Sequence, residues 1–129
     1  MFLVDTNILI YAALDIEPVG FLFQKWVERK QLSLSVIPVS EFLAGIKSKE
    51  ELAIEPLIAQ LDVWPIDLKI ARIAAEYRRQ FAVKSKPPYL LDCFLAATAK
   101  LHNLILVTHN TADFPMKDIK IIDPMRIKR

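Results

Sequence analysis

Four acidic residues follow predicted strands or lie near the starts of predicted helices, and together they could support metal-assisted hydrolysis. They are Asp5, Glu41, Asp92 and Asp113. If the fold brings them together, their like charges repel, so the cluster needs cations or shared protons. Oxygen ligands without His or Cys suit Mg²⁺ or Mn²⁺. Ions held in this way activate water and stabilise the leaving oxygen in phosphodiester hydrolysis.

The elements that must position these acids alternate along the chain. Short apolar or alternating runs predict strands, and longer runs with apolar residues at helical spacing predict helices. The predicted strands are residues 2–5, 32–37, 62–66, 104–108 and 119–122. The predicted helices are residues 7–14, 20–30, 39–46, 50–61, 68–82 and 89–102. We therefore expect a single α/β domain over residues 1–129, with a parallel five-stranded sheet flanked by helices.

Local signals set several of these boundaries. Pro38 is expected to end the second strand and to sit in the first turn of the next helix. Pro56 should kink or break the helix predicted over residues 50–61. Asp67 is expected to cap the helix that follows it, and Asn103 should terminate the helix predicted over residues 89–102.

The predicted fold would collect the four acids at one edge, because ligands of parallel α/β sheets bind outside the carboxyl ends of the strands. Each acid also has an ordinary structural explanation. Asp5 suits a helix N-cap, Glu41 suits the first turn of a helix, and Asp113 suits a turn. Asp92 is harder to explain in this way, because it interrupts an apolar helix and shares a face with small alanines. If none of the four acids had a functional role, four separate structural explanations would have to apply at the same edge of the sheet.

Composition excludes several classes of protein. Of the 129 residues, 53% are hydrophobic, which supports a substantial core and suggests a buried subunit interface. No apolar run approaches the ~20 residues that span a bilayer, and no signal peptide is apparent. A single cysteine, Cys93, excludes an internal disulfide and suits a reducing cytoplasm; we expect it to be a small core residue. Two glycines exclude a Gly-rich phosphate loop.

Four segments carry a resemblance to a known family. The segments "VDTNILI", "SEFLAG", "LLDCFLAATA" and "LVTHNTADF" surround the four acids in chain order, and together they resemble the motifs of PIN-domain ribonucleases of the VapC toxin type. The resemblance implies an Mg²⁺- or Mn²⁺-dependent endoribonuclease with one or two ions, an RNA substrate, a homodimer and an inhibitory antitoxin protein.

The resemblance also assigns roles. It implies that the four acids are catalytic, that Asp5, Asp92 and Asp113 bind metal, and that nearby polar residues support them. Those supporting residues are Asn7, Thr108 and Asn110. The chain departs from the family at His109, where Arg is frequent; a phosphate contact made by that Arg would be weaker or pH-dependent here. From the sequence alone, His109 is expected to be an exposed loop residue.

A basic stretch precedes Asp92 and could guide RNA phosphates, although such runs often form only a solvated surface. It contains Arg78, Arg79, Lys84 and Lys86. Tyr89 could stack on a base, whereas Phe81 is better suited to core packing.

Other functions remain open at this stage. A haloacid-dehalogenase-like phosphatase also begins with a strand and Asp, but it needs a second Asp where this chain has Asn7. A non-catalytic PIN-like module would bind RNA or a partner, and loss of one of the four acids would favour it. A receiver-type signalling domain would need paired acids after the first strand. The aromatic-rich segment over residues 20–30 is expected to expose apolar surface and so favours a homodimer.

Overall fold

The computed structural model describes residues 1–126 and contains one sheet of five parallel strands in the order β3-β2-β1-β4-β5. This confirms the predicted α/β fold with a parallel five-stranded sheet. The strands are β1 (Phe2–Val4), β2 (Leu32–Ser35), β3 (Asp62–Trp64), β4 (Ile105–Val107) and β5 (Ile121–Ile122).

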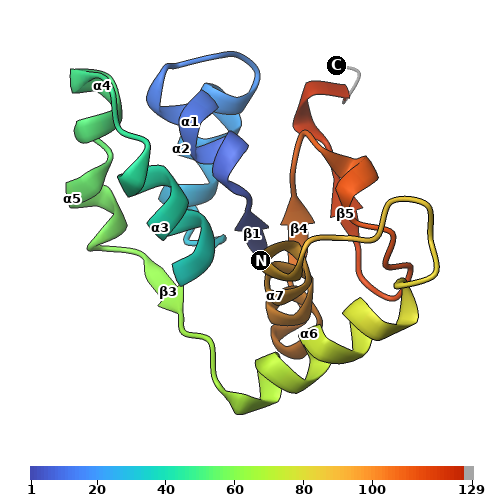
Figure 1. Cartoon of the computed structure of the whole chain (residues 1–129). Coiled ribbons are helices and arrows are strands. Elements are labelled where there is room, and N and C mark those ends of the chain that lie inside the picture. The colour runs from blue at the N-terminus through green and yellow to red at the C-terminus, as the bar shows by residue number, and fades with distance from the viewer. Residues whose placement is uncertain (127–129) are drawn as a thin grey trace.

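Helices cover both faces of this sheet (Figure 1). The α-helices are α1 (Thr6–Ala13), α2 (Val19–Glu28), α3 (Val36–Ala44), α4 (Lys49–Leu52), α5 (Glu55–Ile58), α6 (Leu68–Gln80) and α7 (Leu90–His102). Two short 3₁₀ helices, η1 (Thr111–Asp113) and η2 (Pro124–Arg126), follow β4 and β5. None of the helices described here combines the length and apolar character that crossing a membrane requires.

The two faces of the sheet build two separate cores, because successive side chains of a strand point to opposite faces. Leu3 and Leu106 pack with α6 and α7 on one face. Val4 and Val107 pack with α1, α2 and α3 on the other. All four side chains are fully buried. The buried strands therefore hold helices from distant parts of the chain against one another.

The strand order creates a switch point between β1 and β4. The helix that follows β1 lies on one face, whereas α7, which precedes β4, lies on the other. At such a point the connections diverge and leave a crevice outside the carboxyl ends of the strands, where ligands of open α/β sheets bind. Asp5 follows β1, and Thr108 follows β4.

Several predicted boundaries are wrong. The second strand ends at Ser35, and α3 begins at Val36 instead of after Pro38. Ser35 caps α3, since its hydroxyl accepts a hydrogen bond from the Ile37 N–H at 3.2 Å. Pro38 is the third helical residue, and its missing N–H costs nothing because the first turn has no internal partner for that group.

The helix predicted over residues 50–61 is two single turns, α4 and α5. The break lies at residues 53–54, and Pro56 falls at the second position of α5, where proline is tolerated. The strands predicted over residues 62–66 and 119–122 are also shorter, ending at Trp64 and beginning at Ile121.

Two local predictions are confirmed. The Asp67 carboxylate accepts a hydrogen bond from the Ile70 N–H at 3.0 Å and so caps α6. Asn103 ends α7 in the left-handed region, with φ 54° and ψ 52°. Asn tolerates this conformation better than most residues, which explains its place at the end of the helix.

The aromatic helix α2 exposes less apolar surface than expected. Phe23 and Trp26 are 4% and 7% exposed, and Trp26 stacks on Phe2 with ring centroids 4.4 Å apart. Only Phe21 on this helix is a large exposed hydrophobic residue, at 56%. The aromatic residues of α2 therefore serve mainly the core of this chain, and α2 gives little support for a subunit interface.

Candidate active site

Asp5 lies at the switch point and is held by hydrogen bonds from both sides of it. The Thr6 N–H donates to Asp5 Oδ1 at 2.7 Å, and the Thr108 hydroxyl donates to Oδ2 at 2.8 Å. Asp5 also stands at the N-cap of α1, so the structural and functional interpretations of this residue coexist. Burial raises its pKa, while the Thr108 and Thr6 hydrogen bonds act in the opposite direction.

The predicted polar supports connect to this carboxylate in different ways. The Asn7 side chain donates to Thr108 Oγ1 at 3.4 Å and to Asp5 Oδ2 at 3.5 Å, and it accepts from the His109 N–H at 3.1 Å. Asn110 acts through its backbone: its N–H donates to Thr108 Oγ1 at 3.0 Å, and its carbonyl accepts from the Asp113 N–H at 3.0 Å. Asn7 and Thr108 thus orient Asp5 directly, whereas Asn110 connects Thr108 to Asp113.

Glu41 and Asp113 approach Asp5 from two other elements. Glu41 lies on α3 and is exposed, and its Oε1 accepts a hydrogen bond from the Thr6 hydroxyl at 3.3 Å. Asp113 ends η1, and its Oδ1 lies 3.9 Å from Lys86 Nζ. Thr6 was not identified as a site residue from the sequence, although it stands between Asp5 and Asn7, which were.

Asp92 lies near enough to the other three acids for their negative charges to affect it. It is the third residue of α7 and half-buried. Its pKa is raised from 3.8 to about 7, first by burial and then by the negative charges of Asp5, Asp113 and Glu41. A carboxyl affected by three others from different elements lies in a common electrostatic field. Asp92 therefore titrates near neutral pH.

The chemistry of this donor set fits a hard divalent cation. The four acids present only oxygen atoms, and the raised pKa of Asp92 marks negative charge that a cation would relieve. Within residues 1–126, however, no three acidic, His or Cys side chains converge closely enough to hold an ion in the present arrangement. The carboxylates are gathered but are not a preformed cage.

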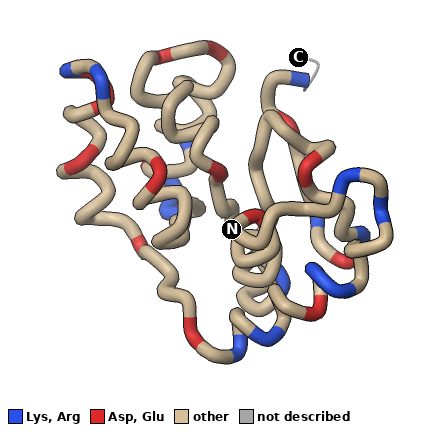
Figure 2. The backbone as a smooth tube through the Cα atoms, viewed as in Figure 1, with Lys and Arg blue, Asp and Glu red and all other residues tan. Residues whose placement is uncertain are grey.

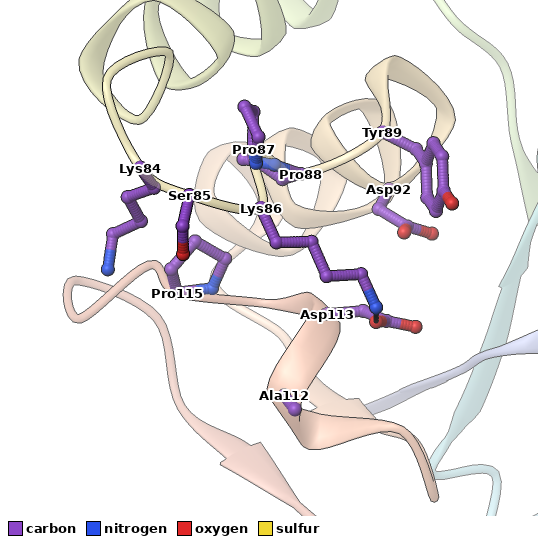
Figure 3. Close-up of a pocket in the computed structure, with 10 residues that line it drawn as sticks. All are labelled: Lys84, Ser85, Lys86, Pro87, Pro88, Tyr89, Asp92, Ala112, Asp113 and Pro115. Atoms are coloured by element: carbon purple, nitrogen blue, oxygen red, sulfur yellow. Dashed lines mark ion pairs between the residues drawn. The ribbon is translucent and has the colours of Figure 1, made fainter.

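The predicted basic residues separate into two groups. Lys84 and Lys86 line a pocket together with Asp92 and Asp113 (Figure 3). Arg78 and Arg79 lie in the last turn of α6 and do not line that pocket. In Figure 2, basic residues gather on α6 and on the loop between α6 and α7.

The expectation that His109 is an exposed loop residue is only partly correct, because His109 lies in the loop after β4 but makes side-chain contacts. Its ring is half-buried, with Nδ1 3.1 Å from Asp123 Oδ2, and it packs edge-on against Tyr11 at 5.9 Å between centroids. Asp123 also accepts from the Met125 N–H at 2.9 Å. His109 therefore joins the end of β4 to the segment after β5. No sequence signal near Asp123 indicated this contact.

Cys93 is a core residue, as predicted. Its side chain is fully buried, and burial together with Asp92 raises its pKa to about 11. A thiol with such a pKa is almost wholly protonated at neutral pH, so nucleophilic catalysis by Cys93 is disfavoured.

The arrangement of strands, helices and acids agrees with a comparison against known families. The sequence profile described as PIN domain matches residues 2–120. The chain belongs to the PIN-domain family. Membership of this family excludes the haloacid-dehalogenase-like phosphatase and the receiver-type domain, because each of those interpretations assigned the acidic residues to a different family.

Similar proteins include several of the VapC type. The chain is 31% identical to Toxin FitB of Neisseria gonorrhoeae in an alignment that covers 96% of this chain and 98% of FitB. It is 29% identical to Ribonuclease VapC10 of Mycobacterium tuberculosis over 116 residues, covering 90% and 87% of the two chains. The crystal structure of FitAcB from Neisseria gonorrhoeae superposes with a TM-score of 0.76 at 28% identity, covering 98% of this chain and 100% of that one.

Proposed function

We propose that this PIN domain is a metal-dependent endoribonuclease that acts as the toxin of a toxin–antitoxin pair. The observation that supports this most strongly is the gathering of four acids at the switch point of the sheet, where three of them raise the pKa of the fourth. Relatives of the chain carry the names ribonuclease and toxin, which agrees with hydrolysis of RNA phosphodiester bonds.

The four acids have different roles in this proposal. Asp5, Asp92 and Asp113 would hold Mg²⁺ or Mn²⁺, one ion or two, with Glu41 beside them. When bound, the metal would lower the pKa of water and stabilise the leaving oxygen. Without metal, Asp92 can hold a proton near neutral pH. Burial raises the pKa of Asp5, and the hydrogen bond from the Thr108 hydroxyl partly opposes this effect.

Cleavage of total RNA tests this proposal. The protein should cut RNA with Mg²⁺ or Mn²⁺ and stop when chelator is added, and Asp5→Asn should be inactive under all these conditions because its anionic oxygen is lost. Asp67→Asn is a matched control, since Asp67 caps α6 away from the acids and should remain active. The readout is the appearance of RNA fragments on a gel.

Two results would contradict the proposal. Cutting that persists in chelator, or in Asp5→Asn, would show that the acids do not hold a needed ion. RNA binding without cutting under any of these conditions would favour the alternative, a non-catalytic PIN-like module that binds RNA or a protein.

We further propose that the chain forms a homodimer and binds a cognate antitoxin whose basic side chain reaches the acidic edge. The structural neighbours include toxin–antitoxin complexes, and the unrelieved charge near Asp92 would attract a cation from a partner. Two leucines beside Asp92 on α7, Leu90 and Leu91, are each 48% exposed and could be covered by either partner. A single buried thiol suits the cytoplasm as the location.

Sedimentation velocity tests these partners. The chain alone should sediment as a dimer at micromolar concentration, and addition of the product of the reading frame next to its own gene should give a heavier complex. Asp92→Asn should weaken that complex, because the basic side chain loses part of its charge partner. A monomer at all concentrations would contradict the dimer, and a complex that leaves RNA cutting intact would contradict the antitoxin contact.

A further inference from the structure

The edge strand β5 supports the end of β4 beside the acidic site, and it has two residues (Figure 1). The two strands pair over positions 106–107 and 121–122. One further backbone bond follows, from the Thr108 N–H to the Ile122 carbonyl at 3.0 Å. The Thr108 hydroxyl donates to Asp5 Oδ2 at 2.8 Å, so the position of the Asp5 carboxylate depends on a short stretch of edge strand.

The side chains of His109 and Asp123 join the two segments just past this pairing. His109 Nδ1 lies 3.1 Å from Asp123 Oδ2, and the Asp123 side chain is only 5% exposed. An ionised carboxylate only accepts hydrogen bonds, so Nδ1 is the donor in this contact. The Met125 N–H also donates to Asp123 Oδ1 at 2.9 Å, and Arg126 Nε lies 3.4 Å from Oδ2. A carboxylate enclosed in this way depends on protein partners and anchors the His109 ring.

The backbone of His109 connects this anchor to the acidic site. Its N–H donates to Asn7 Oδ1 at 3.1 Å. Because the amide oxygen of Asn7 faces His109, the amide nitrogen must point the other way. That nitrogen lies 3.5 Å from Asp5 Oδ2 and 3.4 Å from Thr108 Oγ1. His109 therefore reaches Asp5 along two routes, through the Asn7 amide and through the adjoining Thr108.

We propose that His109 and Asp123 are positioning residues for Asp5. Their contact fixes the backbone after β4, which keeps the Thr108 hydroxyl and the Asn7 amide directed at the Asp5 carboxylate. Without it, the two short strands alone would hold that backbone. This inference rests on the proposed function, in which Asp5 binds Mg²⁺ or Mn²⁺. The PIN profile matches residues 2–120, so Asp123 lies outside it, and His109 is where the chain departs from the family's motifs.

The affinity for Mn²⁺ in the absence of RNA tests this role, measured by isothermal titration calorimetry. His109→Phe keeps a ring beside Tyr11 but removes the nitrogen donor. It should weaken Mn²⁺ binding by about 3- to 10-fold, less than the roughly 10- to 100-fold expected when a group that touches the ligand is lost. His109→Asn removes the ring, but its amide nitrogen is as many bonds from Cα as Nδ1 is. It should therefore bind Mn²⁺ within about 2-fold of the parent, because the donor remains.

A double variant tests whether the two residues act as one unit. Asp123→Ala removes the acceptor and should weaken Mn²⁺ binding about as much as His109→Phe does. Combining the two changes should cost little more than the larger single loss, because either change already breaks the contact. Arg126→Ala is the control: this side chain touches the same carboxylate but is 78% exposed, so its removal should change the affinity by less than about 2-fold.

Melting temperatures separate positioning from a purely structural role. Titrations are made well below the melting transition of each variant, where nearly all of the protein is folded. A structural contact alone would lower the melting temperature of His109→Phe and leave its affinity for Mn²⁺ unchanged, which would overturn the inference. If Asp123→Ala does not fold, the comparison of His109→Phe with His109→Asn still decides.

Two further results would overturn the inference, namely equal losses of affinity in His109→Phe and His109→Asn, or additive losses in the double variant. The proposed function fails in a different way. A parent protein that binds no Mn²⁺ would overturn the metal site and this inference with it. A parent that binds Mn²⁺ with the expected dependence on His109 but never cuts RNA would contradict the ribonuclease function and leave the positioning role in place.

Discussion

Replacing Asp92 with Asn should stabilise the metal-free protein at pH 8, against the usual direction of mutations at half-buried positions. The pKa of Asp92 is raised from 3.8 to about 7 by burial and three neighbouring acids, so its ionised form is unfavourable in the folded state. A shift of this size corresponds to up to ~4 kcal/mol for a fully buried group. Because Asp92 is partly solvated, we expect a gain of roughly 2 kcal/mol in the free energy of unfolding.

The gain should depend on pH in a defined direction. A raised folded-state pKa means that the folded protein binds more protons than the unfolded chain between pH 3.8 and about 7. Stability of the parent therefore falls as pH rises through this window, whereas Asn at this position does not titrate. The difference in the free energy of unfolding between the parent and Asp92→Asn should be small near pH 4 and should reach its full size above pH 7. Urea unfolding in chelator across this range measures it.

Metal should reverse the ranking of the two proteins. At 100 times its dissociation constant, Mn²⁺ should stabilise the parent by roughly 3 kcal/mol. Asp92→Asn should lose most of this gain, and its RNA cleavage should fall by roughly 10²- to 10⁴-fold. Asp67→Ala is the control: loss of this helix cap should cost about 1 kcal/mol with or without metal. If Asp92→Asn behaved like that control and still cut RNA, Asp92 would be only a helix-terminal acid.

Replacing Thr108 with Val should lower the free energy of unfolding, which is the opposite of the effect expected for Asp92→Asn. The variant keeps the shape of the side chain but removes the hydroxyl that donates to Asp5 Oδ2 at 2.8 Å. Hydrogen bonds to a charged group contribute about 1.5–3 kcal/mol, so we expect a loss of roughly 2 kcal/mol at pH 8. RNA cleavage should fall by about 10- to 100-fold, because Asp5, a metal ligand in the proposed function, loses the group that orients it.

The loss in Thr108→Val should shrink as pH falls. The Thr108 hydroxyl lowers the pKa of Asp5 against the effect of burial, so its removal raises that pKa further. The missing bond therefore matters most where Asp5 is ionised and least where it is protonated. Thr108→Ser, which keeps the hydroxyl, is the matched control and should retain cleavage. A loss independent of pH, or equal in Val and Ser, would show that packing and not the hydrogen bond holds Asp5.

The sequence by itself determined the features that depend on near neighbours along the chain. Apolar periodicity located strands and helices, Asp67 marked the start of α6, and Asn103 marked the end of α7. These signals are local because a cap acts on backbone groups within one turn. The four acids were identifiable for a similar reason: each one stands in a short segment whose residues are typical of PIN domains.

Local patterns failed where a side chain competes with backbone propensity. The residues Val36 and Ile37 favour strands, yet they begin α3 because the Ser35 hydroxyl caps the first turn. Similarly, α2 looked like an exposed interface helix, but Trp26 stacks on Phe2 and is covered within the chain. Both outcomes depend on which neighbours the fold supplies.

Only the tertiary structure decided how the acids act together. The hydrogen bond from Thr108 to Asp5 joins residues 103 positions apart, and it exists because β1 lies between β2 and β4. The same strand order brings α7 close enough for the charges of Asp5, Asp113 and Glu41 to raise the pKa of Asp92. It also places the partly exposed ring of His109 beside Asp123. Electrostatic and hydrogen-bond energies depend on distance in space and on burial, and residue types along a chain specify neither.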